Sequence, residues 1–279
     1  MGHVSIPSPI HSALKRAFRL LAPTGMQNML ALHKLWLERQ PWPDLVELPP
    51  GREILILAPH FDDEAIGPGG TLAKHARAGH RLTVLFMTDG RRGDPTAIDG
   101  ALSPEERARR QDALMATRKT EAAEAARILG IGAVYHLDAP EERLSPSREI
   151  VERFRDILKA VRPDLVYLPF LTDRMPDHTA TNAVLMATAD ERLEFRVCGY
   201  EVWNPLYPNI MVNIEETFAQ KCEAIRAHAS QLRFNTYIAC VTGLNAYRAA
   251  CHLNGEGHAE AFYLASLQEY RYLFEALRV

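Results

Sequence analysis

From Glu53 onward the sequence alternates between short apolar runs and longer stretches with helical spacing, which restricts the chain to few folds. Continuous apolar runs of this length are typical of parallel strands that are buried on both faces. Strands are expected at residues 54–57, 82–87, 133–137 and 165–168, with helices at 63–78, 104–129, 147–160 and 177–189. This order predicts an α/β fold with a mostly parallel sheet.

The two ends of the chain differ from this alternating middle. Later segments predict further strands at 197–203, 210–214 and 260–265, and helices at 215–229 and 243–252. Residues 1–50 have helical apolar spacing at 11–22 and 26–39, followed by a stretch rich in proline that ends at Gly51. The sequence therefore predicts a helical extension with a linker over 1–50 and a main domain over 51–279.

Composition excludes several classes of protein. Hydrophobic residues make up 47% of the chain and the formal net charge is −3, as in an ordinary globular protein without the basic excess of a nucleic-acid binder. None of the four cysteines forms a C-x-x-C pair, which favours reduced thiols in a cytoplasmic compartment. No apolar run reaches the roughly 20 residues of a membrane span.

The first predicted strand runs directly into a cluster of titratable residues, His60-Phe61-Asp62-Asp63-Glu64. In an open α/β sheet, ligands bind at the carboxyl ends of the strands, so a site is expected here. Adjacent carboxylates repel each other, and a divalent cation would offset that repulsion. His60 and Asp63 are three residues apart across a strand-to-helix turn and suit zinc, or iron less specifically. Asp62 lies between them and is left free to act as a base.

A third ligand is expected at the end of the fourth predicted strand. His178 begins the helix that follows this strand, again at the carboxyl edge of the sheet. Two histidines and one aspartate leave a coordination position open for water, which is the catalytic pattern of a zinc site.

These motifs resemble the LmbE-like, or PIG-L, family of zinc-dependent de-N-acetylases. The family motif A-H/P-x-D-D-E corresponds to residues 58–64, and H-P-D-H corresponds to Met175-Pro176-Asp177-His178. Weaker similarity appears at residues 87–90, 118–121, 129–130 and 257–262, in the family's order. The resemblance covers about residues 51–265 and implies a Rossmann-like sheet with helices on both faces.

The resemblance also implies roles for individual residues. His60, Asp63 and His178 would bind Zn²⁺, or another divalent metal such as Fe²⁺, and Asp62 would be the general base. Arg118 would contact the substrate. Many members have a histidine where this chain has Met175, and a thioether cannot donate a proton. The proton for the leaving amine is therefore left to Asp62, or to His258, His252 or Asp173, of which His258 and Asp173 are also expected to contact substrate.

The implied activity is removal of an acetyl group from an N-acetylated amino sugar in a glycan, glycolipid or glycoconjugate. Two alternatives remain open, an amidase acting on a thiol conjugate or another acyl amide, and a non-catalytic sugar-binding relative. Basic helices within residues 1–45 are compatible with peripheral membrane contact, although packing on the main domain or in an oligomer is favoured. The glycines at 67, 69 and 70 lack a Lys-Ser/Thr ending, and we interpret them as allowing close packing of a helix on the sheet.

Overall fold

The computed structural model describes Pro23, Met26 and residues 42–189, 193–253 and 255–277. The helices expected within residues 1–40, and with them the membrane contact, lie outside the described residues apart from Pro23 and Met26. The chain divides into one unit over 42–270 and another made of 1–41 with 271–279. The sheet and the candidate site both belong to the unit over 42–270.

The described residues contain one sheet of eight strands in the order β1-β7-β8-β6-β5-β2-β3-β4. The strands are β1 (Asp44–Val46), β2 (Glu53–Ala58), β3 (Arg81–Thr88), β4 (Ala133–Ala139), β5 (Leu165–Pro169), β6 (Arg196–Tyr200), β7 (Ile210–Asn213) and β8 (Ala259–Ser266). Strand β8 pairs antiparallel with β6 and β7, and the other neighbouring strands pair in parallel. The sequence-based prediction of a mostly parallel sheet is confirmed.

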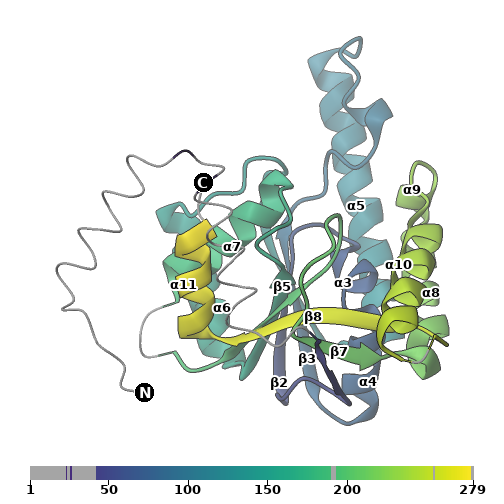
Figure 1. Ribbon diagram of the computed structural model, residues 1–279. Helices are drawn as coiled ribbons and strands as arrows, with labels where there is room; N and C mark the ends of the chain where they lie inside the picture. The colour runs from purple at the N-terminus through teal and green to yellow at the C-terminus, as the bar shows by residue number, and fades with distance from the viewer. Residues whose placement is uncertain (1–22, 24–25, 27–41, 190–192, 254, 278–279) are drawn as a thin grey trace. The chain divides into compact units, whose positions relative to one another are not determined.

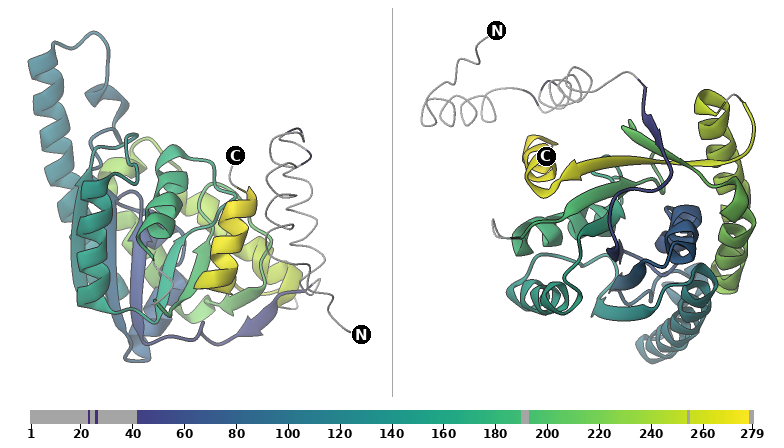
Figure 2. Two further views of the ribbon diagram at one scale, coloured as in Figure 1. Left: turned by 90° about the vertical axis from the view of Figure 1, so that its left-hand side faces the viewer. Right: turned by 90° about the horizontal axis from the view of Figure 1, so that it is seen from below.

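Helices cover both faces of this sheet, as predicted. The helices of the described residues are α3 (Asp63–Ile66), α4 (Gly69–Arg77), α5 (Pro104–Leu129), α6 (Arg148–Val161), α7 (Pro176–Thr188), α8 (Glu215–Ala227), α9 (Ala229–Leu232), α10 (Tyr237–His252) and α11 (Leu267–Leu277), with a 3-10 turn η1 (Pro95–Ala97). Helices α4, α5 and α8 pack together on one face, while α6 and α7 pack on the other (Figure 1). The view from below in Figure 2 separates these two layers. Among the described residues, no helix combines the length and the apolar character needed to cross a membrane.

The helix expected over 63–78 is two helices, α3 and α4, separated by Gly67 and Pro68. The backbone of Gly67 lies so close to Tyr200 that a Cβ atom would overlap its ring. A Cβ atom on Gly70 would likewise stand only 2.7 Å from the Ile214 side chain. The amides at the start of α4 are bound by a carboxylate, since Gly70 and Thr71 both donate to Glu260 at 2.8 Å. The glycines therefore serve close packing, as predicted.

The expected linker contains a strand that sequence reasoning missed. Residues of β1 pair with β7 in the register Asp44↔Ile210 to Val46↔Val212. Prolines flank this strand instead of interrupting it, and β1 lies at the edge of the sheet, where a proline costs no ladder hydrogen bond. The assignment of this segment to a linker is wrong because the count of prolines outweighed their positions.

The parallel strands bring five loops to one edge of the sheet. Strands β2, β3, β4, β5 and β6 all end there, so the residues that follow Ala58, Thr88, Ala139, Pro169 and Tyr200 converge.

All four cysteines are free thiols, as the sequence predicts.

Candidate metal centre

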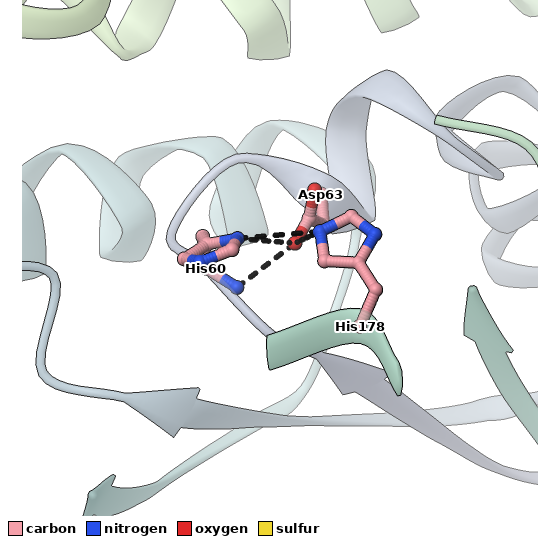
Figure 3. A group of neighbouring side chains, drawn as sticks. All are labelled: His60, Asp63 and His178. Carbon is pink, nitrogen blue, oxygen red and sulfur yellow. Dashed lines mark hydrogen bonds and ion pairs between the residues drawn. The ribbon is translucent and has the colours of Figure 1, made fainter. Parts of the chain in front are cut away.

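Three side chains converge at this edge from two distant segments. His60 lies in the loop after β2, Asp63 is the first residue of α3, and His178 lies in the first turn of α7 (Figure 3). Helix α7 begins with Pro176, a residue suited to the first helical position because its missing N–H would have no partner there. All three side chains are buried, with His60 9% exposed and His178 fully covered.

The donor atoms are spaced as a tetrahedral metal site requires. His60 Nδ1, His178 Nε2 and Asp63 Oδ2 lie 3.3 Å from one another in all three pairs. A zinc ion sits about 2.0–2.1 Å from each ligand, and the edge of such a tetrahedron is therefore about 3.3–3.4 Å. When all His, Cys, Asp and Glu side chains of the described residues are compared, these three are close enough to one another to share an ion. The donor set and its spacing fit a divalent cation.

A second layer of carboxylates holds the two imidazole rings. The Nε2 atom of His60 lies 3.2 Å from Asp177 Oδ2, and the Nδ1 atom of His178 lies 3.0 Å from Asp173 Oδ2. Such partners fix the tautomer and orientation of a ligating histidine and make the facing nitrogen a stronger donor. Each ring thus presents one nitrogen to the centre and the other to an acid.

Electrostatics indicate that this cluster attracts positive charge. Burial lowers the pKa of His60, but hydrogen bonds to Asp177 and Asp63 outweigh it and raise the pKa to about 10. Burial likewise lowers the pKa of His178, while Asp63 and Asp173 raise it to about 9. The carboxyl of Asp63 is buried too, yet the charge and hydrogen bonds of the two histidines hold its pKa well below its usual range.

Metal binding is therefore expected to release protons. At pH 7 both imidazole rings are in the positively charged, doubly protonated form in the metal-free protein, because their pKa values of about 10 and 9 lie above this pH. A metal ligand must be deprotonated, so binding of one zinc ion should displace about two protons. Calorimetric titration at pH 7 in buffers of different ionisation enthalpy measures this number. Zinc binding with no proton release would contradict the charge state described here.

Asp173 lies behind the metal centre, and its described contacts are with the protein. Besides the His178 ring, its carboxylate accepts hydrogen bonds from the backbone N–H groups of Met175, at 3.1 Å, and Trp203, at 3.2 Å. With an exposed fraction of 2%, Asp173 is placed to orient the His178 ring, and the substrate contact expected from the sequence stays a prediction.

Replacing Asp173 with Asn tests this positioning role. We expect the affinity for zinc to fall by about 10–100-fold, because the His178 ring loses the carboxylate that orients it. Equilibrium competition with a chromogenic chelator gives the affinity. Unchanged zinc affinity together with a raised KM would restore the substrate-contact interpretation.

Asp62 occupies a strained position between the two ligands of its loop. Its φ of 152° is rare for a residue other than glycine. Such a conformation costs about 1–3 kcal/mol and persists only where surrounding contacts hold it. The backbone N–H of Asp62 donates to Glu64 Oε2 at 3.2 Å, and its carbonyl accepts from Ala65 and Ile66. The Asp62 carboxylate is one of the charged groups around Arg118, with Oδ2 3.4 Å from its guanidinium.

The environment of Asp62 suits a general base. Burial raises the pKa of its carboxyl to about 6, even though the Arg118 charge acts in the opposite direction. A base with a pKa near the working pH is deprotonated when it must accept a proton and still able to release it later.

Arg118 is buried beneath this loop, with an exposed fraction of 2%. Its guanidinium donates to the carbonyls of Phe61, at 3.0 Å, and Gly90, at 3.2 Å, and lies beside Asp62. The substrate contact expected of Arg118 from the sequence stays a prediction. Its described contacts fix the loop that carries Asp62.

Two further residues in this network escaped the sequence analysis. His228, fully buried where α8 ends, has Nε2 3.3 Å from Glu64 Oε1. Glu64 in turn accepts from the Asp62 backbone, so the pair supports the strained turn. Tyr237 on α10 lies near Asp62: burial raises the pKa of its hydroxyl, and the charges of Asp62 and Asp63 raise it further. His228 lies 164 residues from Glu64 in the sequence, and no local spacing connects them.

His258 and Met175 complete the residues considered from sequence. The Nδ1 atom of His258 lies 2.7 Å from Glu215 Oε2, and its ring stacks on Phe218, so none of its described contacts reaches the metal ligands. Met175 precedes α7 and is 37% exposed. The backbone of His252 ends α10. The structure thus brings together His60, Asp62, Asp63 and His178, with Arg118 and Asp173 as supports, and leaves His258 apart.

Comparison with known proteins agrees with this geometry. Residues 55–189 match the family model of the GlcNAc-PI de-N-acetylases, PIG-L. The diacetylchitobiose deacetylase of Thermococcus kodakarensis is 28% identical over 200 residues, covering 64% of this chain and 70% of that protein. The 4-oxalmesaconate hydratase of Pseudomonas putida is 25% identical over 221 residues, covering 71% of this chain and 83% of that protein.

A solved structure shares the fold. The N,N'-diacetylchitobiose deacetylase of Pyrococcus horikoshii superposes with a TM-score of 0.62 at 25% identity, covering 85% of this chain and 92% of that chain. Family match, fold and ligand geometry point the same way: residues 55–189 match the PIG-L, or LmbE-like, family, and the chain is similar in sequence and fold to deacetylases, which are hydrolases of amide bonds.

Proposed function

We propose that the protein is a zinc-dependent hydrolase that removes the acetyl group from an N-acetylated amino sugar of the N-acetylglucosamine type. The observation that carries this proposal is the equal 3.3 Å spacing of His60 Nδ1, His178 Nε2 and Asp63 Oδ2. Two of the relatives are deacetylases, which supports the acetamide as the group that reacts.

The residues around the centre divide the chemistry. A bound divalent cation supplies Lewis-acid stabilisation of charge on the carbonyl oxygen and lowers the pKa of water. His60, Asp63 and His178 hold that cation, and Asp173 and Asp177 keep the two rings turned toward it. The Asp62 carboxylate accepts a proton from the water that attacks the acetamide carbon.

The proton must then reach the sugar nitrogen as the carbon–nitrogen bond breaks. Met175 cannot donate one, Asp173 is engaged with His178, and His258 is engaged with Glu215. We assign the return of the proton to Asp62, whose pKa of about 6 allows both steps. One water and one amide then give acetate and a free amine.

Acetate release from a panel of N-acetylglucosamine conjugates tests the proposal. The protein is assayed as purified, after removal of metal by a chelator, and after addition of zinc or Fe²⁺. We expect acetate to form, to stop on chelation and to resume with the metal. Metal-dependent cleavage of acyl-cysteine conjugates alone would favour the amidase alternative, and bound zinc without any hydrolysis would favour a sugar-binding protein.

The similarity to a hydratase favours one second candidate, the addition of water to a carbon–carbon double bond of an unsaturated acid. The same metal and base would serve that reaction. Loss of ultraviolet absorbance from an unsaturated dicarboxylate, with no acetate from any sugar, would support this candidate over the deacetylase.

A further inference from the structure

A cavity of about 260 Å³ lies beside the metal centre. It is formed by the end of α3, the segment after β6, helix α10 and strand β8. Much of its lining is apolar, with contributions from Ile66, Val202, Trp203, Pro205, Val241 and Leu244. Trp203 is 48% exposed, so this wall of the cavity meets solvent.

Three lining residues connect the cavity to the reacting groups. Ile66 follows Asp63 by one turn of α3. Tyr237 lies near Asp62, whose charge adds to burial in raising the pKa of the tyrosine hydroxyl. The backbone N–H of Trp203 donates to Asp173, the carboxylate that holds the His178 ring. The cavity therefore lies next to the short helix that carries Asp63 and next to the carboxylate behind His178.

The two acids in the cavity lining are already satisfied by the protein. Glu201 pairs with Arg248 and accepts from the backbone N–H of Leu206 at 2.8 Å. Glu260 is 2.6 Å from Lys221 Nζ and binds the first amides of α4. A ring rich in hydroxyl groups would find few free partners here, and burying unpaired hydroxyl groups is unfavourable.

Asn245 offers the cavity no free acceptor either. Its side-chain nitrogen donates to the carbonyl of Ala259 at 3.0 Å, and its Oδ1 is covered by surrounding atoms.

We infer that the cavity binds an alkyl or aryl group of the substrate. This inference rests on the proposed function and adds the class of substituent that the substrate carries. An apolar cavity of about 150 Å³ already holds benzene, so a phenyl or butyl group fits. The hydrocarbon is attached either at the acyl carbon or at the aglycone.

Two native cysteines provide a probe and its matched control. Cys240 lines the cavity and is exposed, while Cys251 is exposed on the same helix and is not part of the lining. Cys198 and Cys222 are buried. Alkylation by iodoacetamide, followed by mass spectrometry, reports the reaction rate of each thiol in the zinc-loaded wild-type protein without requiring turnover.

The rates are compared in the presence of three compounds. These are the methyl glycoside of N-acetylglucosamine, its benzyl glycoside, and the methyl glycoside of N-butanoylglucosamine. We expect at least one hydrocarbon-bearing compound to slow alkylation of Cys240 severalfold relative to the methyl N-acetyl compound, with Cys251 unchanged. Protection by the benzyl glycoside identifies the aglycone side, and protection by the butanoyl compound identifies the acyl side. Equal Cys240 rates in all three would overturn the inference.

A filling variant tests the same cavity through specificity. In Cys240→Trp, the ratio of kcat/KM for the protecting compound to that for the methyl N-acetyl compound should fall about tenfold or more. In Cys251→Trp this ratio should stay at the wild-type value. An equal ratio in both variants would contradict the inference. If the wild-type protein hydrolyses none of the amides, the proposed function fails, and the alkylation rates still decide whether hydrocarbon enters the cavity.

Discussion

Replacing Asp62 with Asn is expected to lower kcat by about 10²–10⁴-fold, the usual contribution of a general base. The amide has nearly the same shape as the carboxylate but cannot accept the proton of the attacking water. Asp62 is not among the three atoms that surround the cation position, so the variant should keep its full metal content. Acetate release gives the rate, and elemental analysis of the same sample gives the zinc.

The pH dependence of the wild-type enzyme provides a second measure of Asp62. Because burial raises the pKa of its carboxyl to about 6, the base is protonated below this pH and deprotonated above it. The rate should therefore fall as the pH drops through about 6. Asp112→Asn, on the exposed side of α5, is the matched control and should retain the wild-type rate. Turnover by Asp62→Asn within a factor of two of wild type would contradict the assignment.

Replacing His178 with Ala should remove both the metal and the activity. Zinc affinity is expected to fall by more than the roughly 10–100-fold that follows loss of an outer partner, because a ligand itself is lost. The variant also leaves Asp63 and Asp173 buried without the ring between them. Breaking a buried pair in this way lowers the free energy of unfolding by roughly 3–5 kcal/mol. Chemical denaturation and zinc titration measure the two effects separately.

His258→Ala is the matched histidine control for this experiment. The ring of His258 contacts Glu215 and Phe218, and none of its described contacts is a metal ligand. This variant should therefore bind zinc as the wild type does. Zinc affinity that is unchanged in His178→Ala, or lost equally in both variants, would contradict the ligand set.

The residues of the candidate metal centre could be predicted from sequence because their placement depends on topology. A buried parallel strand ends just before His60, and another ends ahead of His178, so both must reach the same edge of the sheet. The spacing of His60 and Asp63 is local to one turn. These features follow from periodicity and strand order, and the structure confirms that the three side chains meet.

Roles that depend on how a helix is rotated could not be predicted in the same way. Arg118 lies on the long helix α5, and only the packing of that helix turns its guanidinium under the Phe61 carbonyl. Asp173 lies in the loop before α7, and only the path of that loop brings its carboxylate to the His178 ring. The support of Glu64 by His228 joins segments 164 residues apart. Such partners become visible only when the elements are assembled.

Breaks within elements were the other source of error. The expected helix is interrupted at Gly67 and Pro68, between the end of α3 and the start of α4. The backbone of Gly67 packs against Tyr200 at this break. Strand β1 escaped prediction because it is short and borders proline-rich sequence, and its pairing with β7 supplies the stability that its own residues do not signal. In both cases, tertiary contacts outweigh local propensity.

The central claim is that His60, Asp63 and His178 share one divalent cation. Anomalous diffraction at the zinc absorption edge, from crystals of the zinc-loaded protein, tests it most directly. The account predicts a single strong peak about 2.0–2.2 Å from His60 Nδ1, His178 Nε2 and an oxygen of Asp63. A zinc-saturated crystal whose anomalous peak lies elsewhere, or in which these three side chains surround no ion, would contradict it.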